Sequence, residues 1–132
     1  MEKPVRSATQ EAYLNLSKLF NLPYDNSMQD WEWEIASYVN FNECLNLYWV
    51  TSSEEERAIL IEILIQSVAN QIDDGLYPEE SKNWATVKSL IYANPKLHAK
   101  SVSYWKQFHE NHEWYPIAKA MQTIWLNIEN IV

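Results

Sequence analysis

Apolar residues recur at helical spacing along nearly the whole chain. In residues 7–20, "SATQEAYLNLSKLF", they recur three and four positions apart, and Ser7 with Gln10 fits a capping box at the start. A second helix is expected after Asn40, because Asn40 and Glu43 can cap it. The apolar sides expected to be buried are Ala12, Tyr13, Leu16, Leu19 and Phe20 in the first helix and Phe41, Cys44, Leu45 and Tyr48 in the second.

The strongest helical pattern begins at the serines of "SSEEERAILIEILIQSVANQIDDGL" and ends at Gly75. Ser52 or Ser53 can cap this helix, and the three glutamates at 54–56 suit the positive end of the helix dipole. Its apolar residues cover most of its circumference: Ile59, Leu60, Ile61, Ile63, Leu64, Ile65, Val68 and Ile72. A helix that is apolar nearly all round is expected to be buried at the centre of the fold.

Three further helices are predicted in the C-terminal third. The first stops at Pro95, which is also a suitable first residue for the next helix, and the last opens at Pro116. Their expected buried faces are, in order, Trp84, Val87, Leu90 and Ile91; Leu97, Ser101, Val102, Trp105 and Phe108; and Ile117, Met121, Ile124, Trp125 and Ile128.

The segment "DWEWEIASY" alternates acid and tryptophan, which could indicate a strand. Strand alternation fits only residues 30–34, whereas helical spacing joins Trp31, Ile35 and Tyr38. We therefore expect a helix here, as in the rest of the chain. In that helix Trp33 lies off the buried stripe, which leaves room for one outward-facing tryptophan.

The composition favours the same architecture. The chain has 132 residues, 47% of them apolar, but only one glycine and five prolines. The frequent turns of all-β domains and the glycine loops of nucleotide-binding folds both need more glycine, so long helices with short connections are expected. We predict an all-α fold in which residues 1–132 form a single domain, a compact bundle of about six to eight helices.

The cysteine count and the apolar stretches bear on compartment. The single cysteine, Cys44, excludes an intramolecular disulfide and a cysteine-based zinc site, and it is expected to be a small core residue. The first residues contain no apolar signal segment, and the longest apolar-rich stretch, 58–72, is interrupted by Glu62 and Gln66. A soluble cytoplasmic protein is therefore expected.

Negative charge is concentrated in the middle of the chain. The net charge is −8, but residues 25–80 carry thirteen acids and a single base, Arg57, for a net charge of −12. This balance argues against binding nucleic acid or an anionic membrane surface. A field of one sign steers an oppositely charged protein, and aromatic side chains beside it can anchor that partner. The candidate partner-binding residues are Asp30, Glu32, Trp33, Glu34, Asp73, Asp74, Tyr77, Glu79 and Glu80.

Catalytic patterns are weak. His109 and His112 are three residues apart, whereas the zincin helix needs two histidines four apart, and nothing in the sequence places His98 beside them. We therefore expect that the protein is not an enzyme and that it has no cofactor and no metal site. An all-α magnesium-dependent nucleotide hydrolase is an alternative, with four acids that could hold the ion: Glu55, Glu62, Asp73 and Asp74.

The stretches "MQDWEWEIASY", "SSEEERAILIEILIQSV" and "NPKLHAKSVSYW" resemble the small all-α immunity proteins of bacterial contact-dependent growth inhibition systems. The likeness spans most of the chain as a general pattern, and no functional residue is carried over from the family. It implies a protein that binds the C-terminal toxin domain of an incoming effector, often a nuclease with a basic active-site surface. The expected partner is therefore a basic nuclease toxin. The other alternative is a non-catalytic adaptor whose acidity serves only solubility.

Overall fold

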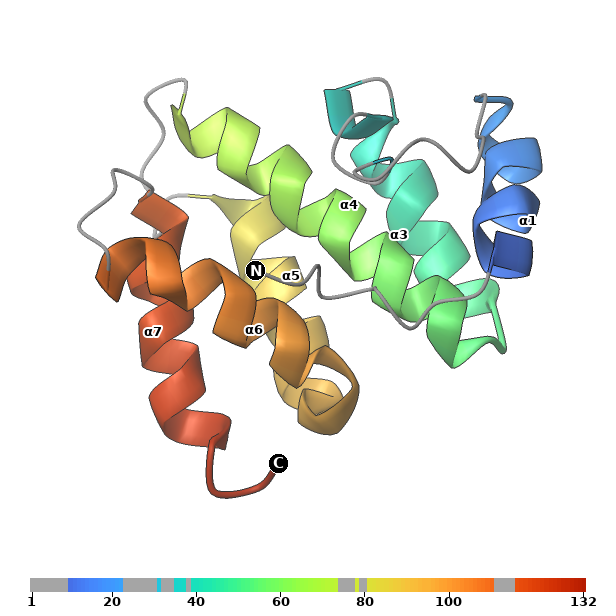
Figure 1. Ribbon diagram of the computed structural model, residues 1–132. Helices are drawn as coiled ribbons and strands as arrows, with labels where there is room; N and C mark the ends of the chain where they lie inside the picture. Colours follow the sequence, from blue (N-terminus) through green and yellow to red (C-terminus); the bar gives the residue numbers. More distant parts are fainter. Residues whose placement is uncertain are drawn as a thin grey trace. The chain divides into compact units, whose positions relative to one another are not determined.

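The computed structural model describes residues 10–22, 31, 35–37, 39–73, 78, 81–110 and 116–132. These residues form six α-helices and one short 3-10 helix and no strand, which confirms the all-α prediction (Figure 1). In chain order the elements are α1 (Gln10–Phe20), η1 (Ile35–Ser37), α3 (Phe41–Val50), α4 (Glu54–Asp73), α5 (Lys82–Ala93), α6 (Pro95–Glu110) and α7 (Pro116–Ile128).

The chain divides into two compact units, Met1–Ser67 and Val68–Val132, called here the N-terminal and C-terminal units. The boundary falls inside α4, so that helix contributes residues to both. The single-domain organisation of residues 1–132 stays a prediction. No helix among the described residues has the length and apolar character needed to cross a membrane.

Helix α1 buries a face that is rotated from the one its sequence predicts. Ala12, Tyr13 and Leu16 are buried as expected, but Ser17 is buried with them and its hydroxyl donates to the Leu14 carbonyl oxygen at 2.7 Å. Leu19 is exposed, which makes its assignment to the core wrong. The reason is helix geometry: two residues turn the helix by about 200°, so burial of Ser17 carries Leu19 toward solvent.

Two of the caps predicted in the N-terminal unit are confirmed, whereas the capping box at Ser7 lies outside the described residues. The Asn40 side chain accepts hydrogen bonds from the Asn42 and Glu43 amides at 2.9 and 3.2 Å and begins α3. Ser53, of the two serines considered, begins α4, because its hydroxyl accepts from the Glu56 amide at 3.2 Å. These bonds satisfy amides that have no partner inside the helix.

Helix α4 is apolar around most of its circumference, as predicted. Each of the eight apolar residues assigned to its core is buried: Ile59, Leu60, Ile61, Ile63, Leu64, Ile65, Val68 and Ile72. Glu62 lies among them and is also fully buried. Glu62 shares one side of the helix with Gln66 and Asn70, which are half-buried, so its complete burial is a result of packing that helical spacing does not predict.

Only part of the "DWEWEIASY" segment is described. Trp31 and Ile35 are buried, as helical spacing predicts, and the Trp31 ring meets the Tyr13 ring edge-on with centroids 5.8 Å apart. Residues Ile35–Ser37 form the 3-10 helix η1, and the Ser67 hydroxyl donates to the Ala36 carbonyl oxygen at 3.2 Å. A helix over residues 32–34 stays a prediction, since these lie outside the described part.

In the C-terminal unit, α6 begins at Pro95 and α7 at Pro116, as predicted, and the two helices pack against each other. Most of the predicted faces are buried, including Trp84, Val87, Leu90 and Ile91 of α5; Ser101, Val102 and Trp105 of α6; and Ile117, Met121, Ile124 and Ile128 of α7. Trp125 is only half-buried, with the Lys106 ammonium 5.6 Å from the centroid of its ring.

Two histidines considered for a metal site lie in α6. His98 is fully buried, which its polarity does not predict. His109 also lies within α6, which runs to Glu110. The side chain of His109 and the whole of His112 lie outside the described residues.

Candidate functional site

The predicted partner-binding residues lie almost entirely outside the described part of the chain. Asp73 is the last residue of α4, but its side chain is not described. The others are Asp30, Glu32, Trp33, Glu34, Asp74, Tyr77, Glu79 and Glu80. Their role in binding a partner therefore stays a prediction.

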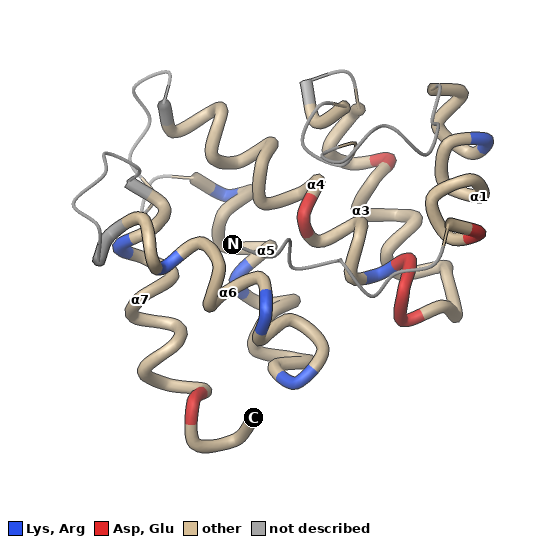
Figure 2. Tube along the Cα trace, viewed as in Figure 1, with Lys and Arg blue, Asp and Glu red and all other residues tan. Residues whose placement is uncertain are grey.

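The described charges differ in sign between the two units (Figure 2). The described part of the N-terminal unit has six acids but only two bases, Lys18 and Arg57. In the C-terminal unit six lysines accompany one described carboxylate side chain, that of Glu129. The acids of the N-terminal unit are Glu11, Glu43, Glu54, Glu55, Glu56 and the buried Glu62. Apart from half-buried Glu56 and buried Glu62, all of them are exposed.

Arg57, the only base between residues 25 and 80, serves as a cap for α3. Its Nε donates to the Tyr48 carbonyl oxygen at 3.2 Å, and its Nη2 donates to the Thr51 carbonyl oxygen at 2.8 Å. The guanidinium carbon also lies 5.8 Å from the centroid of the Tyr48 ring. A cation at the end of a helix complements the negative pole of the dipole. Arg57 thus holds the turn between α3 and α4.

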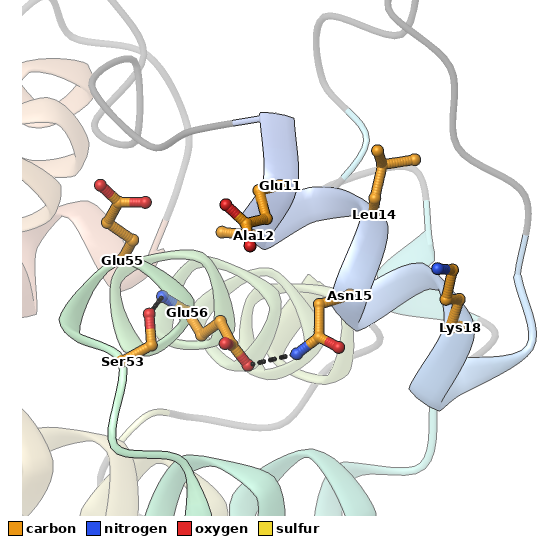
Figure 3. A pocket seen from close by; sticks show the side chains of 8 residues that line it. All are labelled: Glu11, Ala12, Leu14, Asn15, Lys18, Ser53, Glu55 and Glu56. Atoms are coloured by element: carbon orange, nitrogen blue, oxygen red, sulfur yellow. Dashed lines mark hydrogen bonds between the residues drawn. The ribbon is translucent and has the colours of Figure 1, made fainter.

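An acidic hollow of about 500 Å³ lies between α1 and the first turn of α4. Figure 3 shows Asn15 and Glu56 meeting across it, where the Asn15 amide donates to the Glu56 carboxylate at 3.2 Å. Glu11 and Glu55 lie toward one end and Lys18 toward the other. The lining residues are Glu11, Ala12, Leu14, Asn15, Lys18, Ser53, Glu55 and Glu56.

The hollow suits a cationic group better than an anion, since three carboxylates outnumber one ammonium. Two acids considered for magnesium, Glu55 and Glu62, are seven residues apart in α4, about 10 Å along its axis. One is exposed and the other fully buried, so they do not form a pair. Within the described residues, no three His, Cys, Asp or Glu side chains are grouped as a metal ion would require.

The outer face of α3 carries an exposed tryptophan that the sequence reasoning missed. Trp49 is 62% exposed and Val50 80% exposed, although Trp31, Trp84 and Trp105 are all buried. This face, named here the α3 face, consists of Asn42, Glu43, Asn46, Trp49 and Val50. Helical spacing could have found it, because residues 42, 46, 49 and 50 recur at i, i+4, i+7 and i+8 and two of them are asparagine.

Cys44 lies on the opposite side of α3 and is a core residue, as predicted. Its thiol donates to the Leu60 carbonyl oxygen at 3.8 Å. Burial raises the pKa of the Cys44 thiol from 9.0 to about 12, because the thiolate loses its hydration. The thiol therefore stays protonated at neutral pH, which does not suit a nucleophile.

A second hollow, of about 320 Å³, lies between α5 and α7 in the C-terminal unit. Trp84, Lys88, Tyr92 and Ile124 are among its lining residues, and the Asn127 amide donates to the Tyr92 hydroxyl at 2.9 Å. Neither hollow pairs a nucleophile with a base, among the described residues that line it, in the way a catalytic site would.

Comparison with protein-family models, with curated proteins and with solved structures found no match to this chain.

Proposed function

We propose that this protein is an immunity protein that binds and neutralises a basic toxin domain, a nuclease acting on RNA or DNA. It would cover the toxin's active site with an acidic surface that includes aromatic side chains. The observation that carries the proposal is the charge of the N-terminal unit, where exposed glutamates on α1, α3 and α4 outnumber the bases.

The chemistry of a nuclease makes an acidic inhibitor effective. A nuclease must present lysine and arginine to a phosphate backbone, and a carboxylate surface can occupy the same groups. Long-range attraction between the two surfaces raises the association rate, and it weakens when salt screens the charges. Affinity then depends on a few side chains that become dry on binding.

Two features of the structure support this proposal. Four exposed glutamates, Glu11, Glu43, Glu54 and Glu55, outnumber Lys18 and Arg57 among the described residues of the N-terminal unit. Trp49 supplies an exposed aromatic side chain in the same unit. The predicted partner-binding acids Asp30, Glu32 and Glu34 belong to the same unit and would add to its negative charge.

The test is rescue of cells that express the protein encoded by the neighbouring gene. We expect co-expression to restore growth. The purified proteins should form a complex, and its association rate should fall as salt rises from about 50 to about 500 mM, because the Debye length shortens from about 14 to about 4 Å. Failure to rescue growth together with failure to capture a basic protein would contradict the proposal.

The same proteins separate the proposal from its alternatives. Reversal of Asp73, Asp74, Glu79 and Glu80 to lysine should slow association in low salt if the acids steer a partner. An adaptor whose acidity serves only solubility would be unaffected by that reversal. Tight stoichiometric binding of Mg²⁺ in a calorimetric titration would favour the hydrolase instead.

A further inference from the structure

We infer that the α3 face is where the basic partner docks, with Trp49 as its central anchor. This inference rests on the proposed function, since it identifies the surface and the partner chemistry of the same interaction. The occupant is a basic protein surface that places an arginine or lysine over the indole ring.

Exposure singles out the end of α3. Trp49 and Val50 are adjacent and both lie mostly in solvent, whereas three other described tryptophans are buried. A tryptophan contributes a large apolar area when it becomes dry, and tryptophan is among the residues most enriched at the energetic centres of protein interfaces. Asn42 and Asn46 continue the same face with amide groups that can donate and accept hydrogen bonds.

The anchor is presented on a well-supported helix. The Trp49 ring meets the Tyr48 ring edge-on, with centroids 5.8 Å apart. Asn40 caps the start of α3, and Arg57 holds the carbonyls at its end. Because these contacts fix the helix before a partner arrives, binding needs to order few additional groups.

Charge identifies the occupant as basic. Glu43 is exposed on the α3 face itself, and Glu54 is exposed four residues beyond Val50, in the first turn of α4. A guanidinium or ammonium group of the partner can lie over the Trp49 indole. Exposed Glu43 and Glu54 outnumber Arg57 around α3 and so favour a basic surface there. An acidic partner would be repelled by the same groups.

The experiment compares Trp49→Ala with Leu126→Ala, a truncation of an exposed side chain on α7 in the C-terminal unit. Binding to the purified neighbouring toxin is measured by calorimetry and protection by co-expression. We expect the Kd to rise more than tenfold for Trp49→Ala, as for interface anchors in general, and less than about twofold for Leu126→Ala. Thermal melting of each variant checks that both fold.

Two further variants keep the inference testable if Trp49→Ala fails to fold. Asn46→Arg adds bulk and positive charge to the α3 face without removing a packed group, and it should weaken binding at least tenfold. Glu43→Gln should slow association mainly at low salt. If the wild-type protein protects cells and these variants protect equally, the α3 face is not the interface, although the proposed function stands. If the wild type neither binds nor protects, both proposals fail.

Discussion

Replacing Arg57 with alanine should destabilise the N-terminal unit substantially. The guanidinium group makes two hydrogen bonds to carbonyl oxygens, at 3.2 Å to Tyr48 and 2.8 Å to Thr51, and neither carbonyl lies inside a complete helical ladder. The group is half-buried, so water can reach the carbonyls only in part after the change. The substitution also removes a cation from the negative end of α3.

The expected loss follows from these contacts. A hydrogen bond to a charged group contributes about 1.5 to 3 kcal/mol, and the lower figure suits a half-buried site. Two such bonds give about 3 kcal/mol, and the dipole contributes about 0.5 kcal/mol more. We therefore expect the free energy of unfolding to fall by about 3.5 kcal/mol.

Urea unfolding followed by circular dichroism measures this change. With a slope of about 1.5 kcal/mol per molar urea, the midpoint should fall by about 2 M while the slope stays constant. Arg57→Lys keeps the charge but loses the forked donor, so it should recover less than about half of the loss. Lys100→Ala, at an exposed position on α6, is the matched control and should stay within about 0.5 kcal/mol. An Arg57→Ala protein as stable as this control would refute the capping role.

Three other predictions concern the cap of α3, the buried face of α1 and the buried thiol of α3. Asn40→Ala should lower the free energy of unfolding by about 1 kcal/mol in urea titrations, because two amides of α3 lose their acceptor. Leu16→Ala should lower it by about 3 kcal/mol, whereas Leu19→Ala should change it by less than about 0.5 kcal/mol; equal effects would show that Leu19 is in the core after all. Because the pKa of Cys44 is 9.0 when exposed and about 12 when buried, the folded thiol holds its proton more tightly, and stability should decline as pH rises from 9 toward 12. Cys44→Ala should remove that part of the decline when stability is measured against pH.

The backbone of the fold could be predicted because local signals agree with tertiary packing. Ser53 supplies a hydroxyl before three glutamates, and Pro95 and Pro116 begin helices because a first-turn residue needs no amide hydrogen. Leu19, which was wrongly assigned to the core, has no such local signal. Leu19 has helical spacing, but burial of Ser17 turns it outward, and only the packing of α1 decides between the two.

The candidate site was less predictable, because charge along a sequence does not determine which side chains meet in space. The role of Arg57 depends on a turn that returns its guanidinium to carbonyls six and nine residues earlier. Trp49 was overlooked because aromatic residues are usually assigned to cores, although its spacing from Asn42 and Asn46 places it on a polar face. Polar neighbours at helical spacing are thus a usable guide to exposed anchors.

The buried thiol also makes the protein convenient for fluorescence work. Cys44 is the only cysteine of the chain and is shielded from solvent, so a thiol introduced at the surface would be the one that maleimide dyes reach. Ser52→Cys, at an exposed position two residues after Val50, would carry such a dye next to the α3 face, where its emission would change as another molecule binds. Labelling would then need no removal of the native sulfur, and a stopped-flow trace would report arrival and departure directly.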